Sequence, residues 1–147
     1  MSGMRDAIAP GFGERFALNS TWGLAGLGAF CAIAVVKQGS LFSFIAVLLV
    51  LFLSHWFRRR AMHDQQRRNE AMEDERDSAI ASRGDRAFRV TASIGIVALA
   101  LALAIPAMRG PLLEVALRLP GVLLLALIAA NLVGHVVVAH AYVRERR

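Results

Sequence analysis

The sequence predicts an all-α integral membrane protein: a four-helix bundle of two transmembrane hairpins, with a charged helical cytoplasmic loop between them. Three observations predict this fold class. The chain of 147 residues is 56% hydrophobic with a mean hydropathy of +0.51, which is more apolar than a typical soluble domain. It contains four apolar runs, each close to the ~20 helical residues that cross the hydrocarbon core of a bilayer. One long charged stretch separates the second run from the third.

The four apolar runs are the predicted membrane spans, because none of them has a polar face to present to water. We place them at about residues 16–36, 41–57, 88–108 and 119–143 of a single transmembrane domain, residues 1–147. The charged cytoplasmic loop covers residues 58–87. No A-x-A-like cleavage site follows the first run at the usual distance, so we expect this run to be retained as a span.

The first hairpin combines small residues with a short turn. Gly23, Gly26 and Gly28 in its first helix predict close packing against a neighbouring helix. Cys31 follows them and is the only cysteine, so it cannot form an intramolecular disulfide. We expect it to be a small buried hydrophobic residue. Residues 37–40 form the tight outer turn, and the second span ends in an aromatic and basic border typical of a membrane interface.

The second hairpin has a longer outer connection. Pro106 and Pro111 interrupt the helical pattern after the third span. Residues 112–118 are predicted to lie along the outer interface as a short amphipathic turn. Pro120 suits the first turn of the fourth helix, which is expected to run as far as Arg144.

Lys and Arg residues are distributed unevenly over the two sides of this arrangement. Fourteen of the seventeen fall in the N-terminal segment, the central loop or the C-terminal segment, and only Lys37, Arg109 and Arg118 fall on the other side. By the positive-inside rule, the chain is a multi-pass protein of a prokaryotic cytoplasmic (inner) membrane, with both its N-terminus and its C-terminus cytoplasmic. The net charge of +6 then predicts contact with the anionic headgroups of the bilayer and not with nucleic acid.

The central loop carries its charge in three blocks. Residues 58–68 have a net charge of +4, residues 70–77 of −4 and residues 83–89 of +2. Basic ends near the membrane and an acidic middle favour a helical hairpin whose tip points away from anionic headgroups.

The second arm of this loop is predicted to be a short capped helix. Asp74 is expected to cap it at the start and Gly84 to end it. Asp85 and Arg89 are four residues apart, which is the spacing of an ion pair on a helix surface. Ile80 is the only aliphatic side chain larger than alanine in this arm, so we expect it to contact the membrane or the protein.

A short motif in this arm resembles a known group of proteins. Residues 74–80 read DERDSAI, and residues 83–87 (RGDRA) lead into the third span. This pattern resembles the DERD-x-x-I cytoplasmic loop of small uncharacterised prokaryotic four-span membrane proteins, a domain-of-unknown-function group. The resemblance covers about fifteen residues, with similar hydropathy around them. It implies a membrane location and a regulatory or stress-linked role, and it implies no catalytic residue.

Four acidic residues at the tip of the loop are the predicted partner-binding site: Glu73, Asp74, Glu75 and Asp77. The favoured function is a non-enzymatic interaction or regulatory module that docks a cytoplasmic protein, or a second copy of the chain, through this tip. The acidic spacing does not match an EF-hand, which needs oxygen ligands at alternating positions, a central glycine and a closing glutamate, so no metal site is predicted. No catalytic triad, zinc motif or phosphate loop predicts an enzyme.

Three histidines define an alternative function, a protein that binds haem b or a divalent metal. A b-type haem between helices needs imidazoles from opposite sides at matching depth, and His55 with either His135 or His140 could supply them. His135 and His140 point about 140° apart on one helix, so both cannot face one site. Histidines that only contact headgroups are the simpler interpretation, and no resident cofactor is predicted.

Asn131 is the most polar residue in the centre of a predicted span. No carboxylate lies deep in any span, which disfavours a proton-coupled exporter because ion relay needs an ionisable group. A third function is a small oligomeric transporter or channel in which Asn131 faces a pore.

Overall fold

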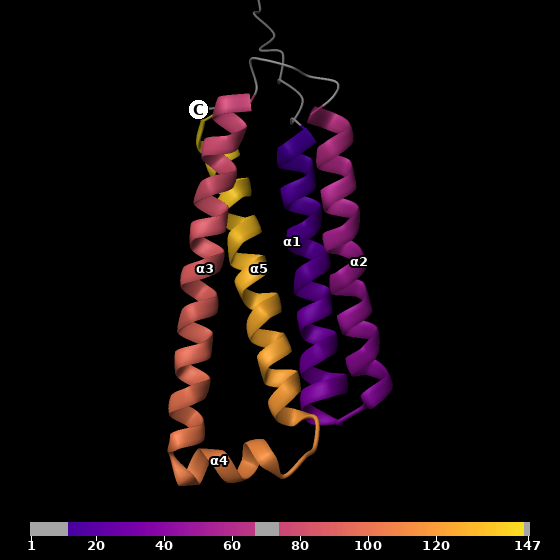
Figure 1. Cartoon of the computed structure of the whole chain (residues 1–147), viewed down its shortest axis with the longest axis vertical. Coiled ribbons are helices and arrows are strands. Elements are labelled where there is room, and N and C mark those ends of the chain that lie inside the picture. The colour runs from indigo at the N-terminus through magenta and orange to yellow at the C-terminus, as the bar shows by residue number, and fades with distance from the viewer. Residues whose placement is uncertain (1–11, 67–73, 146–147) are drawn as a thin grey trace, which may run out of the picture.

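The computed structural model describes the backbone of residues 12–66 and 74–145, and the side chains of residues 15–56 and 78–145. Within these ranges the chain is helical apart from short turns and contains no strand, so the all-α prediction is confirmed. The elements in chain order are α1 (Phe12–Phe30), the π-helix η1 (Cys31–Lys37), α2 (Leu41–Gln66), α3 (Asp74–Ala104), α4 (Pro106–Leu113) and α5 (Arg118–Glu145) (Figure 1).

Three segments of the described chain are helical, long and apolar enough to cross a membrane. They are Arg15–Lys37, Ser78–Ala104 and Arg118–Glu145. The apolar part of α2, Leu41–Trp56, is shorter. At ~1.5 Å per residue it extends about 24 Å, against ~30 Å for the hydrocarbon core, although the helix itself continues to Gln66.

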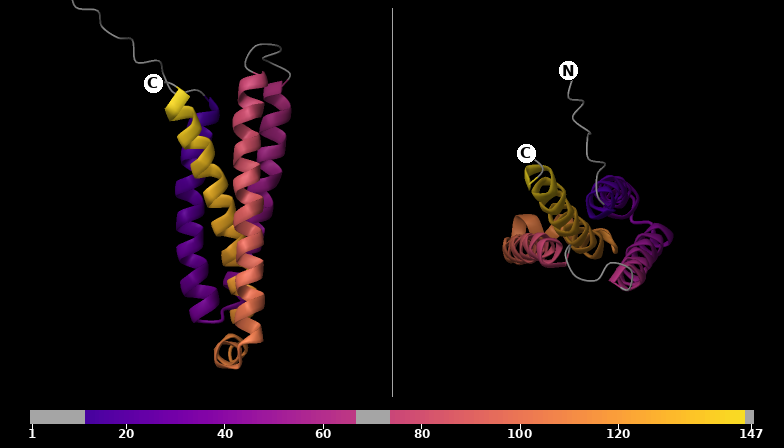
Figure 2. Two further views of the ribbon diagram at one scale, coloured as in Figure 1. Left: turned by 90° about the vertical axis from the view of Figure 1, so that its left-hand side faces the viewer. Right: turned by 90° about the horizontal axis from the view of Figure 1, so that it is seen from above.

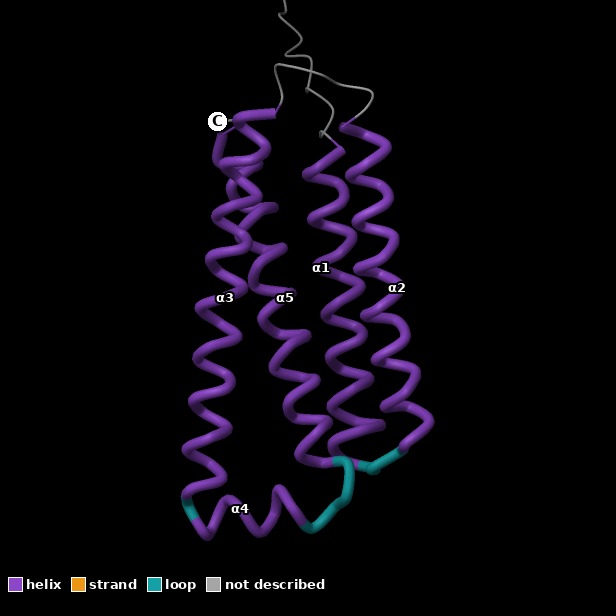
Figure 3. The backbone as a smooth tube through the Cα atoms, viewed as in Figure 1, coloured by secondary structure: helices purple, strands orange, loops and turns teal. Residues whose placement is uncertain are grey.

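The termini of the described chain lie at one end of the molecule. α1 begins there, α5 ends there, and so do the ends of α2 and α3 that flank residues 67–73 (Figure 1). The turn after η1 and the short helix α4 lie at the opposite end (Figure 3). The described basic side chains at the ends of the long helices follow the predicted charge asymmetry. Arg15 and Arg144 lie at the first end, and Lys37 and Arg118 lie at the second.

The four long helical segments form an open arc. α5 lies between α3 and α1 and packs against both, whereas the only extended contact of α2 is with η1. The end-on view shows α2 and α3 at the two ends of the arc (Figure 2). This differs from a closed four-helix bundle, in which α2 would also pack along α3. The apolar part of α2 holds one alanine and no glycine, so bulky side chains prevent the close backbone approach that α5 makes.

A buried cluster joins η1, α2 and α5 near the second end. It consists of Cys31, Val35, Val47, Leu124 and Ile128. Cys31 is fully buried, which confirms the expectation for the lone cysteine.

Two glycines bring α3 and α5 into backbone contact near the first end, where α1 begins and α5 ends and which is called the charged end from here on. A Cβ atom added at Gly84 would lie 3.1 Å from the carbonyl oxygen of Gly134, and one added at Gly134 would lie 3.2 Å from the carbonyl oxygen of Gly84. α3 runs straight through Gly84, so the prediction that this glycine ends the helix is wrong. Ile80, one turn earlier on the same face, is fully buried, which confirms that it contacts protein.

The turn between η1 and α2 follows from two residues. Gly39 has φ +67°, the left-handed conformation that ends helices and that glycine adopts without strain. The amide of Gly39 donates to the carbonyl of Val35 over 2.9 Å. The hydroxyl of Ser40 accepts a bond of 3.2 Å from the amide of Ser43, and so caps α2. The tight turn predicted at residues 37–40 is thereby confirmed.

The outer connection of the second hairpin differs from the prediction. α3 ends at Ala104, before the expected residue 108, because Ile105 adopts an extended conformation (φ −89°, ψ 115°) in front of Pro106. Pro106 then starts α4, which lies across the end of the other helices (Figure 3). Most of α4 lies before residues 112–118. The short helix at this end therefore begins earlier in the chain than the predicted amphipathic turn. Pro120 lies in the first turn of α5, as predicted.

Candidate functional site

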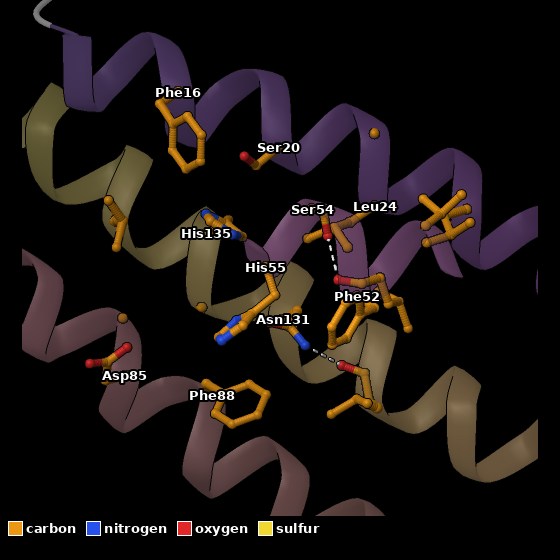
Figure 4. A pocket seen from close by; sticks show the side chains of 18 of the residues that line it. Phe16, Ser20, Leu24, Phe52, Ser54, His55, Asp85, Phe88, Asn131 and His135 are labelled. Carbon is orange, nitrogen blue, oxygen red and sulfur yellow. Dashed lines mark hydrogen bonds between the residues drawn. The ribbon is translucent and has the colours of Figure 1, made fainter. Parts of the chain in front are cut away.

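A cleft of about 950 Å³ opens between the two arms of the arc, toward the charged end. Its walls come from α1, α2, α3 and α5 (Figure 4). α5 leans from η1 at one end of the molecule toward α3 at the other, and it therefore separates from α1 as the chain approaches the charged end (Figure 1). Because α2 packs mainly on η1 and joins α5 only in the buried cluster near the second end, the described helices leave this space open.

The lining of the cleft is polar toward the charged end and apolar away from it. On α2, Leu48 and Leu51 precede Ser54 and His55 along the chain. On the other walls, Ser20, Asp85 and His135 also lie in the half toward the charged end, where Phe16, Ala81 and Val138 accompany them, and Leu24, Leu27 and Leu127 lie farther from it. The polar lining residues are Ser20, Ser54, His55, Asp85, Asn131 and His135. The cleft is thus amphipathic along its length.

The three candidate histidines separate into two groups. His55 from α2 and His135 from α5 both line the cleft (Figure 4). The ring of His135 packs edge-on against Phe16 of α1, with 6.1 Å between the ring centroids and 64° between the planes. His140 is exposed and does not line the cleft, in line with its angular separation from His135.

Two polar side chains of the lining bond to their own helices. The Asn131 amide nitrogen donates to the carbonyl of Leu127 over 2.9 Å, and the Ser54 hydroxyl donates to the carbonyl of Leu51 over 2.8 Å (Figure 4). Each side chain thereby uses a donor on its own backbone and keeps an oxygen that can accept a hydrogen bond. Asn131, which the channel hypothesis places at a pore, lines this cleft within a single chain.

Asp85 and Phe88 are lining residues that the sequence analysis missed. It paired Asp85 with Arg89, but no ion pair joins these two residues, whose side chains are both described. The arginine of this segment that is paired is Arg83, whose guanidinium lies 3.5 Å from the carboxylate of Glu145. The spacing of Ala81, Asp85 and Phe88 (i, i+4, i+7) on one face of α3 was a readable signal.

The glycines of α1 divide in a way that the sequence did not predict. A Cβ atom at Gly28 would lie 3.4 Å from Cγ2 of Ile128, so the expected close packing holds there. At Gly23 and Gly26 an added Cβ would meet no atom within 4 Å, so the prediction is wrong for packing within the chain. Gly23 lines the cleft and Gly26 does not.

The predicted acidic docking site lies outside the part of the chain whose side chains are described. Glu73 precedes α3, and Asp74, Glu75 and Asp77 belong to its first turn by backbone only. Docking of a cytoplasmic protein or a second copy through these residues stays a prediction. Among the described side chains, no group of three or more His, Cys, Asp or Glu residues is arranged to hold a metal ion.

No protein-family model matches the chain, and neither a curated protein nor a solved structure matches it. The resemblance of residues 74–80 to the DERD-x-x-I group therefore stays a prediction, and the functional argument rests on the cleft.

Proposed function

We propose that the chain is a four-span, non-enzymatic protein of a prokaryotic cytoplasmic membrane, with both termini cytoplasmic, and that it binds an amphiphilic molecule in the cleft between α2 and α3. The observation that carries this proposal is a cleft of about 950 Å³ whose described polar side chains lie in the half toward the charged end and whose leucines lie mainly in the other half. Binding sites for small molecules are typically concave, mostly apolar and furnished with a few polar groups that orient the ligand.

The exposed side chains support a bilayer environment. Phe42 is 84% exposed, Trp22 78% and Phe52 68%, and further large apolar side chains are exposed on every long helix. Each Å² of apolar surface left in water costs about 25 cal/mol, so a monomer with this surface would be unfavourable in water and favourable in lipid. The sorting of basic residues between the two ends supports the orientation.

The shortness of the apolar part of α2 is compatible with a fourth span. In the sequence, Trp56 is followed by Phe57 and then by three arginines, and an aromatic and basic border of this kind is typical of the end of a membrane span. A short span is accommodated by local thinning of the bilayer at a cost of fractions of a kcal/mol per Å. The gap beside such a helix would open toward the lipid, which gives an amphiphile a lateral route into the cleft.

Filling the cleft is the direct test of this function. Gly23→Phe adds a ring to the wall without meeting any atom within 4 Å of its Cβ, whereas the matched control Gly26→Phe adds the same ring outside the cleft. We expect an amphiphile to co-purify in mild detergent with the parent chain and with Gly26→Phe, and to be lost from Gly23→Phe. The readout is mass spectrometry of organic extracts of the three purified proteins, normalised to protein. Three extracts of identical composition would contradict the proposal.

A second function is favoured by one observation: His55 and His135, from α2 and α5, line the same cleft. A haem held there would draw an axial imidazole from one or both of them. On this alternative, the purified protein shows a Soret band that His55→Ala abolishes and that His140→Ala, outside the cleft, leaves unchanged. A protein without a Soret band after expression with added haem would eliminate this alternative.

A further inference from the structure

The described polar groups of the cleft combine donors, on Ser20, His55 and His135, with a set of acceptors. Asp85 contributes a carboxylate, and Asn131 and Ser54 direct a donor toward their own helices, which leaves their oxygens as acceptors. Among the lining residues whose side chains are described, none is a lysine or an arginine. A ligand that complements this set brings hydrogen-bond donors or positive charge.

Asp85 is the one acidic side chain among the described lining residues, and it is exposed. It lies on α3 about one turn before the apolar stretch that starts at Val90, and Figure 4 shows it on the wall of the cleft. Within the described residues no hydrogen bond or ion pair engages its carboxylate. Arg86 and Arg89 on the same helix are exposed and do not line the cleft, and Arg83 is paired with Glu145. The charge of Asp85 is therefore available to a ligand.

Aromatic rings supplement this charge. Phe88 lies one turn after Asp85 on the same wall, and Phe16 and Phe52 belong to the facing walls (Figure 4). The face of a phenyl ring attracts a cation within about 6 Å of its centroid, and more strongly where water is excluded. The leucines at the far end of the cleft offer an apolar body only nonspecific contact, so discrimination by charge comes from the end that holds Asp85.

We propose that the cleft selects amphiphilic organic cations, with the positive head at Asp85 and Phe88 and the apolar body against Leu48, Leu51 and Leu127. The proposal rests on the proposed function of the cleft and names the chemical class of its ligand. In the proposed orientation, a cation whose charge is balanced by Asp85 would lie at the cytoplasmic interface of the bilayer.

Two probes of the same shape and opposite charge separate this inference from the function on which it rests. Tetraphenylphosphonium and tetraphenylborate are measured by equilibrium dialysis against the full chain in a nonionic detergent, with empty micelles as the blank. We expect saturable binding of the phosphonium and none of the borate above the blank. Asp85→Asn should weaken phosphonium binding by about two- to fivefold, the size expected for loss of one solvent-exposed charge pair. Glu114→Gln removes an exposed carboxylate at the opposite end and should leave the affinity unchanged.

Each other outcome overturns a stated part of the proposal. Equal binding of the two probes, or preference for the borate, would overturn cation selectivity while leaving an amphiphile-binding cleft in place. Unchanged phosphonium affinity in Asp85→Asn would overturn the role of this carboxylate. Saturable binding of neither probe, together with no extractable amphiphile, would overturn both the selectivity and the proposed function.

Discussion

Replacing Gly84 by alanine should destabilise the protein, although the same change in the interior of a helix normally stabilises it. A Cβ atom at this position would lie 2.5 Å from Cγ2 of Val138 and 3.1 Å from the carbonyl oxygen of Gly134. The valine can move, but the carbonyl belongs to the backbone of α5. Such overpacking typically costs about 1–3 kcal/mol. We expect the free energy of unfolding of Gly84→Ala to fall by that amount, measured by titration from mild detergent into SDS.

The control for this prediction has the opposite sign. Gly26→Ala meets no atom within 4 Å, so it removes only the conformational freedom of glycine and should stabilise by up to about 0.5–1 kcal/mol. Adding Val138→Ala to Gly84→Ala removes the nearer of the two clashes and should restore part of the loss. If Gly84→Ala is as stable as Gly26→Ala, α3 and α5 do not cross at these glycines.

The sequence was sufficient for the helical class and for the turn at residues 37–40, because these depend on local chemistry. Gly39 and Ser40 determine this turn through the conformations that their own backbones allow, whereas Pro106 ends α3 four residues before the predicted end. Gly84 shows where local reasoning fails. Glycine ends helices when no neighbour needs the space, but here α5 occupies the place of the missing side chain.

The candidate site was predictable only in part. His55, His135 and Asn131 were recognised as polar residues in apolar helices, and all three line the cleft. The cleft itself could not be predicted, because it depends on how α5 leans and on α2 packing mainly against η1. Asp85 was missed because an arginine four residues away offered a sufficient local partner. Only the arrangement of the helices shows that this exposed residue lines a cleft.

The central claim is that α2 and α3 stand apart and leave a cleft at the charged end. Cysteines at Ser54 on α2 and Ala81 on α3, both lining residues, test it in a background with Cys31→Ser. A disulfide needs Cα atoms within about 7 Å. The control pair, Gly28→Cys with Ile128→Cys, joins α1 to α5, where Cγ2 of Ile128 lies 3.4 Å from a Cβ placed at residue 28.

The measurement is iodine oxidation in native membranes, followed by cleavage at a protease site introduced between residues 66 and 74 and by a non-reducing gel. The cleft predicts that oxidation joins the two fragments of the control pair and leaves those of the Ser54/Ala81 pair separate. A long bismaleimide should then join the fragments of the Ser54/Ala81 pair. Efficient disulfide formation between positions 54 and 81 would mean a closed bundle with no room for a ligand, and would contradict the account.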